Sequence, residues 1–184
     1  MLQIISLLVE NKPGALMRVT GLLSARGYNI ESLTVARTLD PELSRMTIVV
    51  DVEHNLRAQV IKQMNKLVNV LQAADLTESR AVCHEMALLK VRAAPESREA
   101  VAREAGIFGA RMVDCAADTF TIEATGDPEK LEEFIASMRS FGEIELTRSG
   151  VIAMALDNRR LRLQPPIPPR AAARIEQTDG VLNG

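Results

Sequence analysis

The turn near the N-terminus contains the residues best suited to bind a small polar ligand. Pro13 and Gly14 precede an amphipathic run, so the turn presents backbone N–H groups at the start of a helix. These groups have no acceptors inside the helix, and the aligned peptide dipoles add partial positive charge there. Asn11 before the turn and Asn29 after the helix carry amides that can donate to a carboxylate or accept from an ammonium. Together they predict a pocket for a free amino acid.

Two simpler interpretations of these residues remain open. Pro-Gly is common in loops, so Gly14 can be a turn glycine without any ligand. Asn29 follows Gly27 and Tyr28 at a helix-to-strand junction, where an Asn side chain often closes a turn with its own backbone. We also expect the turn to be tight, so that a side chain at Gly14 would be crowded.

Hydrophobic periodicity indicates which elements position the turn. An apolar run over 2–9 predicts an interior strand, and the stripe that begins at Leu16 predicts a helix that ends before Gly27. The same reasoning predicts strands over 29–38, 44–53 and 70–76, and a helix over 56–67. The order strand-helix-strand-strand-helix-strand is typical of a ferredoxin-like unit.

The third strand of this unit alternates most clearly. Met46, Ile48 and Val50 alternate with Arg45 and Thr47, which predicts one buried face and one polar face. Right-handed crossovers would put both helices on one side of the sheet. The other side is therefore expected to be available for pairing.

The second half repeats this order with little sequence identity. Asp127 is the expected N-cap of its second helix, with Pro128 at the first helical position and Gly142 ending the helix. Its first turn, over 93–96, lacks glycine and has Glu96 where an anion would bind, so no second amino-acid site of this type is expected. The remaining elements are predicted as strands over 85–92, 110–114, 119–124 and 143–147 and a helix over 96–105.

The chain is thus predicted to be an α+β protein of two ferredoxin-like βαββαβ domains, each an antiparallel sheet with helices on one face. We expect the domains to span 1–78 and 79–157. Residues 158–184 contain a proline-dense, locally basic segment that predicts a flexible Pro/Arg-rich tail. Docking of this tail on a partner is the less favoured alternative.

Composition excludes several functional classes. The 184 residues are 47% apolar, and the net charge of −2 gives no electrostatic footprint for nucleic acid. Four Phe, one Tyr and no Trp leave few stacking platforms for bases. The sequence has no run long enough to cross a membrane and no signal peptide, so a cytoplasmic protein without membrane or nucleic-acid partners is expected.

Catalytic chemistry has no obvious residues to perform it. Cys83, His84 and Glu85 form the most reactive-looking cluster, but neighbouring strand residues point to opposite faces and the ligand spacing of a metal site is absent. No phosphate-binding loop, dinucleotide fingerprint or nucleophile elbow is found. We therefore expect no catalytic residues, no metal and no cofactor in this chain.

Three segments connect the chain to a known family. The stretches 10–16, 27–35 and 43–48 resemble the regulatory (small) subunits of acetolactate synthase, the enzyme that opens branched-chain amino-acid synthesis. A weaker match is Arg148-Ser149-Gly150-Val151, and the resemblance extends over about residues 1–157. It implies that 1–78 is an ACT domain, a ligand-sensing module, followed by a C-terminal small-subunit domain.

The resemblance also implies a ligand and a partner. In that family the feedback inhibitor is usually valine, bound between two ACT domains of a dimer. We expect a homodimer in which the neighbouring copy can contribute Asn29. The residues that match the effector site are Asn11, Gly14, Ala15, Leu16, Asn29 and Ile30. The implied partner is the catalytic large subunit, which would hold the thiamine diphosphate, Mg²⁺ and FAD of the family. A free-standing amino-acid sensor that regulates another enzyme is the alternative, and the sequence does not distinguish valine from leucine or isoleucine.

Overall fold

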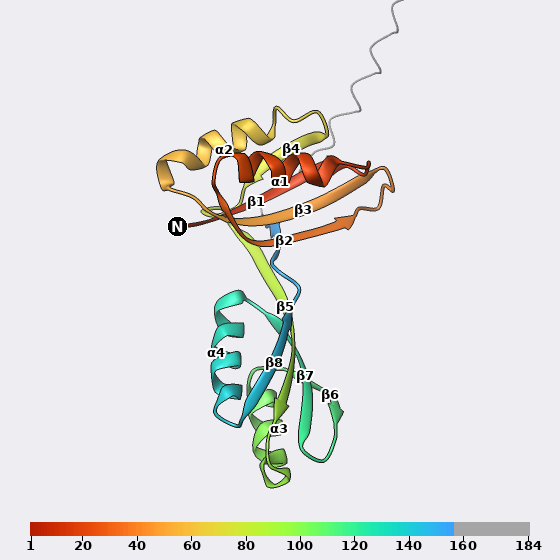
Figure 1. The fold of residues 1–184 in the computed structure, drawn as a ribbon, viewed down its shortest axis with the longest axis vertical. Helices are drawn as coiled ribbons and strands as arrows, with labels where there is room; N and C mark the ends of the chain where they lie inside the picture. Colours follow the sequence, from red (N-terminus) through yellow and green to blue (C-terminus); the bar gives the residue numbers. More distant parts are fainter. Residues whose placement is uncertain (157–184) are drawn as a thin grey trace, which may run out of the picture.

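The computed structural model describes residues 1–156, so the predicted tail over 158–184 lies outside the described residues. Two βαββαβ units follow one another along the chain (Figure 1). The first consists of β1 (Leu2–Glu10), α1 (Ala15–Ala25), β2 (Asn29–Arg37), β3 (Leu43–Asp51), α2 (Arg57–Met64) and β4 (Val70–Asp75). The second consists of β5 (Ala81–Arg92), α3 (Arg98–Ile107), β6 (Arg111–Cys115), β7 (Thr119–Gly126), α4 (Pro128–Arg139) and β8 (Glu143–Arg148), followed by β9 (Ile152–Ala155).

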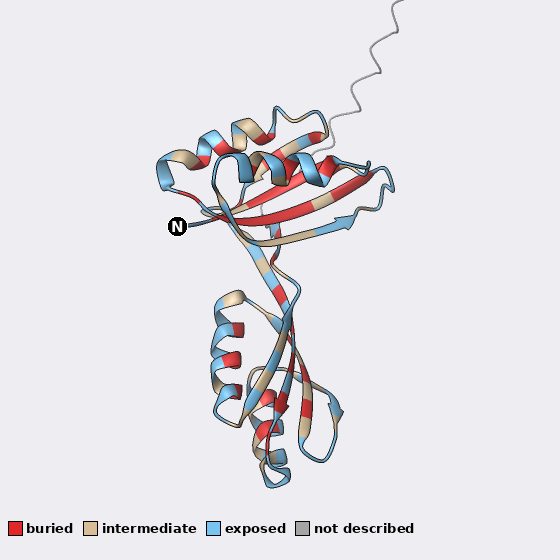
Figure 2. Ribbon diagram, in the orientation of Figure 1, coloured by how far each residue is buried: buried red, intermediate tan, exposed pale blue. Residues whose placement is uncertain are grey.

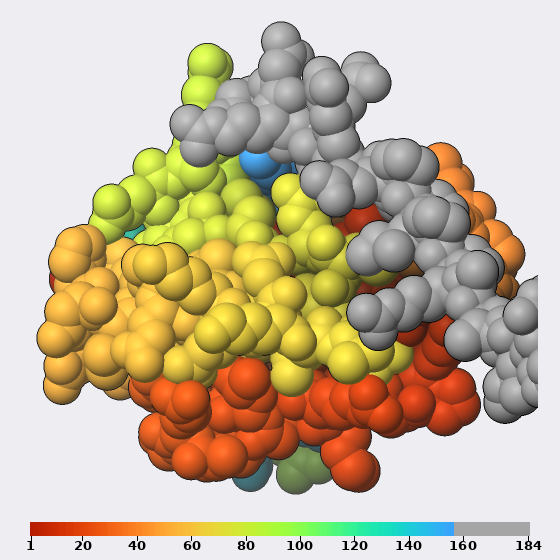
Figure 3. All heavy atoms as spheres, turned by 90° about the horizontal axis from the view of Figure 1, so that it is seen from above, coloured from red at the N-terminus to blue at the C-terminus, as the bar shows by residue number. Residues whose placement is uncertain are grey.

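Both sheets have the strand order of a ferredoxin-like fold. The first runs β2-β3-β1-β4 and the second β6-β7-β5-β8, with antiparallel pairing throughout. In each unit the two helices lie on one face of the sheet, and α1 and α2 lie side by side over the first sheet (Figures 1 and 3). This confirms the predicted α+β fold of two ferredoxin-like units.

Each unit has its own hydrophobic core between helices and sheet. In the first unit Val19 and Leu23 of α1 pack with Met46 and Ile48 of β3, all of them almost fully buried. In the second unit Phe134 of α4 lies in a separate cluster and stacks against Phe108 at a tilt, with ring centroids 5.4 Å apart. Figure 2 shows buried positions along the central strands β1 and β3 of the first sheet and on the helices of both units.

The structure adds a strand that periodicity did not predict. β5 begins at Ala81 rather than Glu85, and its first four residues pair with β9, from Ala81 against Ala155 to His84 against Ile152. We call this two-stranded piece the ribbon, defined as residues 81–84 and 152–155. It was missed because four residues of mixed apolar type give neither a clear strand period nor a helical one. The helix predicted over 96–105 begins at Arg98, because 95–97 form a 3-10 turn.

The ribbon corrects the expected polar face of β3. Thr47 was expected on an open polar face, yet Thr47 and its neighbour on that face, Val49, are 3% and 6% exposed. The ribbon and the chain that enters it lie against this helix-free face, and β9 contacts β1 there. The chain itself therefore covers much of the face that was expected to be available for pairing. Only the second sheet leaves its helix-free face open, where Lys90 pairs with Glu145 and Arg111 with Glu123.

Candidate functional site

The start of α1 is open to an anion. Gly14 has φ +82° and ψ −8°, a left-handed conformation that favours glycine, and no side chain caps the helix. The first turn contains no acidic residue. Within residues 1–156 the backbone N–H groups of Leu16 and Met17 have no hydrogen-bond acceptor. These groups are the donors that the sequence predicted for a carboxylate.

The turn is not crowded, contrary to expectation. A Cβ built on Gly14 has no neighbouring atom within 4 Å. The sequence predicted a tight turn because Pro-Gly constrains the backbone, but the turn projects into open space. The cost of a side chain at this position therefore comes from the positive φ alone.

Asn11 ties the turn to the loop between β2 and β3. Its backbone N–H donates to Glu42 O at 2.7 Å, and its Nδ2 donates to Pro41 O at 2.8 Å. One amide hydrogen is therefore engaged, while Oδ1 has no donor among residues 1–156. Asn11 lies beside Gly14 and remains exposed, so its amide can still contact a ligand at the helix start.

Two polar side chains hold the carboxylate of Glu10, the residue before Asn11. Glu10 accepts hydrogen bonds from Lys12 Nζ at 2.9 Å and from Asn69 Nδ2 at 2.7 Å. Lys12 first, and Asn69 second, hold the pKa of the Glu10 carboxyl below its ordinary value. The end of β1 therefore keeps a carboxylate near the turn, neutralised by Lys12.

Ala15 and Leu16 complete the N-terminal part of the predicted site. Ala15, the first residue of α1, is buried, whereas Leu16 is 44% exposed and Met17 is 76% exposed. Apolar surface thus lies next to the two free N–H groups. This combination suits a ligand with one carboxylate and one aliphatic side chain.

Asn29 and Ile30 lie at the opposite end of the sheet from Asn11. Asn29 pairs with Asp51 of β3, and Asp51 in turn pairs with Leu2 at the start of β1. Asn11 instead follows Glu10, the last residue of β1. Eight residue steps of strand separate those ends, or roughly 25 Å. Within one chain the predicted pocket is therefore divided. Ile30 packs against the first core, and the Asn29 amide donates to the Glu31 carboxylate.

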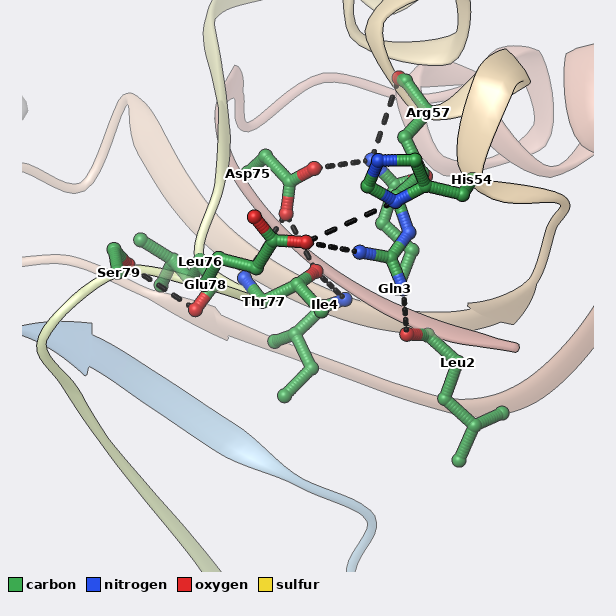
Figure 4. Close-up of polar contacts among 10 residues, drawn as sticks. All are labelled: Leu2, Gln3, Ile4, His54, Arg57, Asp75, Leu76, Thr77, Glu78 and Ser79. Atoms are coloured by element: carbon green, nitrogen blue, oxygen red, sulfur yellow. Dashed lines mark hydrogen bonds and ion pairs between the residues drawn. The ribbon is translucent and has the colours of Figure 1, made fainter.

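A second polar cluster lies where the chain leaves the first unit, and sequence reasoning missed it (Figure 4). Arg57, only 8% exposed in its side chain, donates from Nη1 to Glu78 Oε1 at 3.0 Å and from Nη2 to Leu2 O at 3.0 Å. The fully buried Gln3 donates from Nε2 to Asp75 Oδ2 at 2.7 Å. These bonds hold the segment between β4 and β5 against the start of β1.

This cluster is structural rather than catalytic in its geometry. The Arg57 guanidinium is committed to Glu78 and a backbone carbonyl, and Nδ1 of His54 lies 3.8 Å from the same Glu78 oxygen. Among residues 1–156, no group of three or more His, Cys, Asp or Glu side chains is arranged to hold a metal ion. In the same residues no helix is long and apolar enough to cross a membrane.

Cys83, His84 and Glu85 do not form a site. Exposure alternates along them, with His84 exposed and Glu85 5% exposed, as expected for neighbouring strand residues. Glu85 accepts two hydrogen bonds from Arg148, each 2.7 Å long. Burial, together with the charge of Asp127, raises the pKa of the Cys83 thiol, which makes it a poorer nucleophile at neutral pH.

Two family models match the chain. The model described as the small subunit of acetolactate synthase matches residues 84–157, and the model described as an AHAS small subunit-like ACT domain matches residues 5–72. The two matches correspond to the second and first βαββαβ units.

Proteins similar over almost their whole length give the same result. The chain is 49% identical to a probable acetolactate synthase small subunit of Archaeoglobus fulgidus, over 85% of this chain and 98% of that protein. It is 43% identical to the small subunit of acetolactate synthase isozyme 3 of Salmonella typhimurium, over 88% of this chain and all of that one. The crystal structure of the acetolactate synthase small subunit of Thermotoga maritima superposes with a TM-score of 0.76 at 36% identity, covering 86% of this chain and 99% of the other.

Proposed function

Because the chain belongs to the family of acetolactate synthase small subunits, we propose that it binds valine or a related branched-chain amino acid and controls a catalytic large subunit. The observation that carries this proposal is the open start of α1. The free N–H groups of Leu16 and Met17 would receive the carboxylate of the effector, and the exposed Leu16 side chain would contact its aliphatic part.

The effector site is completed by a second copy of the chain. β2 is an edge strand of the first sheet, with β3 on one side only. If two β2 edges pair antiparallel about their midpoint, Leu33, Asn29 of one copy lies opposite Arg37 of the other. Arg37 is aligned with Ser44, close to the end of β1 that leads to Asn11 and Gly14. A two-fold dimer would thus reunite the two halves of the pocket.

Control of the catalytic partner follows from linkage. An effector that binds across two copies favours the arrangement in which the pocket is closed. It alters the partner only through its different affinity for the active and inactive assemblies, and coupling of about 1–3 kcal/mol would give a roughly 5- to 150-fold effect. Acetolactate chemistry, with its thiamine diphosphate, Mg²⁺ and FAD, would belong to the large subunit.

The test mixes the full chain with the thiamine-diphosphate-dependent large subunit of the same organism. We expect the chain to raise the rate of acetolactate formation and to make that rate sensitive to valine, while calorimetry detects valine binding to the chain alone. Leucine and isoleucine are titrated in parallel to identify the preferred effector. Valine binding without any effect on the large subunit would instead favour a free-standing sensor of another enzyme. Acetolactate formation by the chain alone would overturn the regulatory proposal.

A further inference from the structure

One segment of the second unit lies directly on β2 of the first. Thr34 Oγ1 donates to Ser149 O at 3.3 Å, and Val151 N donates to Ser32 Oγ at 3.4 Å. Gly150 lies between them at φ +78°, and a Cβ there would be 3.0 Å from Thr34 Oγ1. We call residues 149–151 together with Ser32 and Thr34 the joint. The positive φ favours glycine here, and a Cβ would be in tight contact with Thr34.

On its other side the joint is held firmly by the second unit. Ser149 N donates to Met86 O at 2.9 Å, and Met86 N donates to Ser149 Oγ at 3.1 Å. The preceding residue, Arg148, forms a two-pronged pair with the buried Glu85 and also bonds to Glu132 of α4. Bidentate, partly buried pairs of this kind hold their geometry well. A displacement of Ser149 would therefore be passed to β5 and α4.

The two sides of the joint differ in strength. Its hydrogen bonds to β2 are 3.3 and 3.4 Å long, near the limit for such bonds, whereas those into the second unit are 2.7 to 3.1 Å. A cavity of about 570 Å³, lined by Ser32 of β2 and by Glu132 of α4, leaves room for movement there. The β2 side is thus the side that can shift.

From this asymmetry we infer that the joint transmits the movement of β2 caused by effector binding to the second unit. Thr34 and Gly150 act as positioning residues. The inference rests on the proposed function, because β2 carries Asn29 at its start and is the strand that would pair in the dimer. Closing the effector pocket moves β2 against residues 149–151, and the short bonds to Glu85 and Met86 carry the shift to α4. The joint contains no effector contact of its own.

The experiment uses the full chain with its large subunit and two variants of the joint. Thr34→Val removes the donor with little change of shape, and Gly150→Ala forces a Cβ against Thr34. The matched controls are Thr121→Val, another half-buried strand threonine, and Gly109→Ala, which has φ +70° but nothing within 4 Å of its Cβ. We expect both joint variants to bind valine within about twofold of wild type while losing most of the roughly 5- to 150-fold effect that such coupling allows.

Hydrogen exchange of the chain alone supplies a readout that a general loss of stability would not reproduce. Valine should change exchange at residues 148–152 and in α4 of the wild type and the controls, but not in the joint variants. If both joint variants bind valine and are inhibited by it as strongly as the wild type, the transmitting role of the joint is wrong, while the proposed function stands. A wild-type chain that does not bind valine would overturn the proposed function together with this inference.

Discussion

The two units have the same topology but begin their first helices differently. α1 follows Gly14 with two free N–H groups and no acid in its first turn, whereas α3 follows a 3-10 turn that contains Glu96 and has Glu99 in its own first turn. A local carbonyl engages one N–H in both units, with Ser97 N donating to Ala94 O and Ala15 N donating to Lys12 O. The difference therefore lies in the acidic side chains near α3. One fold thus has a helix start without acidic residues in one unit and a helix start flanked by acidic residues in the other, and a few turn residues make the difference.

The helix-free faces of the two sheets also differ. In the first unit Leu8 and Val49 are buried on that face, which the chain itself covers. In the second unit the same face shows Lys90 and Glu145, both largely exposed. The first unit therefore buries apolar surface of this face against the rest of the chain, whereas the second unit leaves its face exposed to solvent.

Separating the units should produce the largest effect. A fragment of residues 1–79 exposes Leu8 and Val49, and full burial of such side chains contributes about 1.5–3 kcal/mol each, so we expect a loss of about 3–6 kcal/mol. A fragment of residues 80–156 should keep a stability close to that of the second unit in the full chain, because its helix-free face is already exposed to solvent there. Thermal unfolding followed by circular dichroism measures both fragments. Equal stability of the 1–79 fragment and the first unit of the full chain would contradict the comparison.

Gly14→Asp should strongly weaken effector binding. The new carboxylate would take the N–H groups of Leu16 and Met17, and hydrogen bonds to a charged group contribute about 1.5–3 kcal/mol, so we expect valine to bind about 10- to 150-fold more weakly. Calorimetry on the full chain provides the measurement. Gly14→Asn has similar size, tolerates the same backbone and adds no charge, so it separates the charge effect from strain.

A second control for that variant is Gly27→Asp, at the other end of α1. Gly27 also has a positive φ, +72°, and open space around a built Cβ. We expect this variant to lose stability without losing valine affinity beyond about twofold. Equal valine affinity of the Gly14→Asp variant and the wild type would remove the proposed site.

The capped helix of the second unit offers a smaller effect. Asp127 Oδ1 accepts a hydrogen bond from Glu129 N at 2.9 Å, and loss of such an N-cap costs about 0.5–2 kcal/mol. Asp127→Ala should therefore lower the free energy of unfolding by about 1 kcal/mol, measured by urea titration. Ser97→Ala is the matched control, because Ser97 makes no capping hydrogen bond at the start of α3. A loss of the same size in the control would mean that the cap is not the cause.

The smallest expected effect concerns pH. Lys12 and Asn69 lower the pKa of Glu10 in the folded state. The ionised Glu10 therefore stabilises the folded state at pH values above the pKa that it has in the unfolded chain. This stabilisation is lost as the pH falls through the lower pKa of the folded state. Lys12→Ala should raise the pKa of Glu10 and remove less than about 1 kcal/mol at neutral pH. Carboxyl NMR titration measures this, and Lys62→Ala is the control. An unchanged Glu10 titration in the Lys12 variant would exclude Lys12 as the cause.

Local pattern was sufficient for most of the fold. The predicted strands and helices were found within a few residues of their bounds, and Asp127 caps α4 as expected. Periodicity did not predict β9, which is short and apolar on both faces. It predicted β3 as a strand but not the burial of its polar face, which another part of the chain covers. The polar cluster around Arg57 and Gln3 gave no local signal, because its partners are 21 to 73 residues away.

The sequence by itself determined the two βαββαβ units, the glycine turn before α1 and the family to which the chain is similar, because these depend on residues close together along the chain. Tertiary structure alone decided that Asn11 and Asn29 lie at opposite ends of one sheet and that the ribbon covers the first sheet. It also decided that Ser149 and Val151 contact β2. Those last contacts join residues 115 and 119 positions apart, and no local period encodes a pairing between segments so distant along the chain.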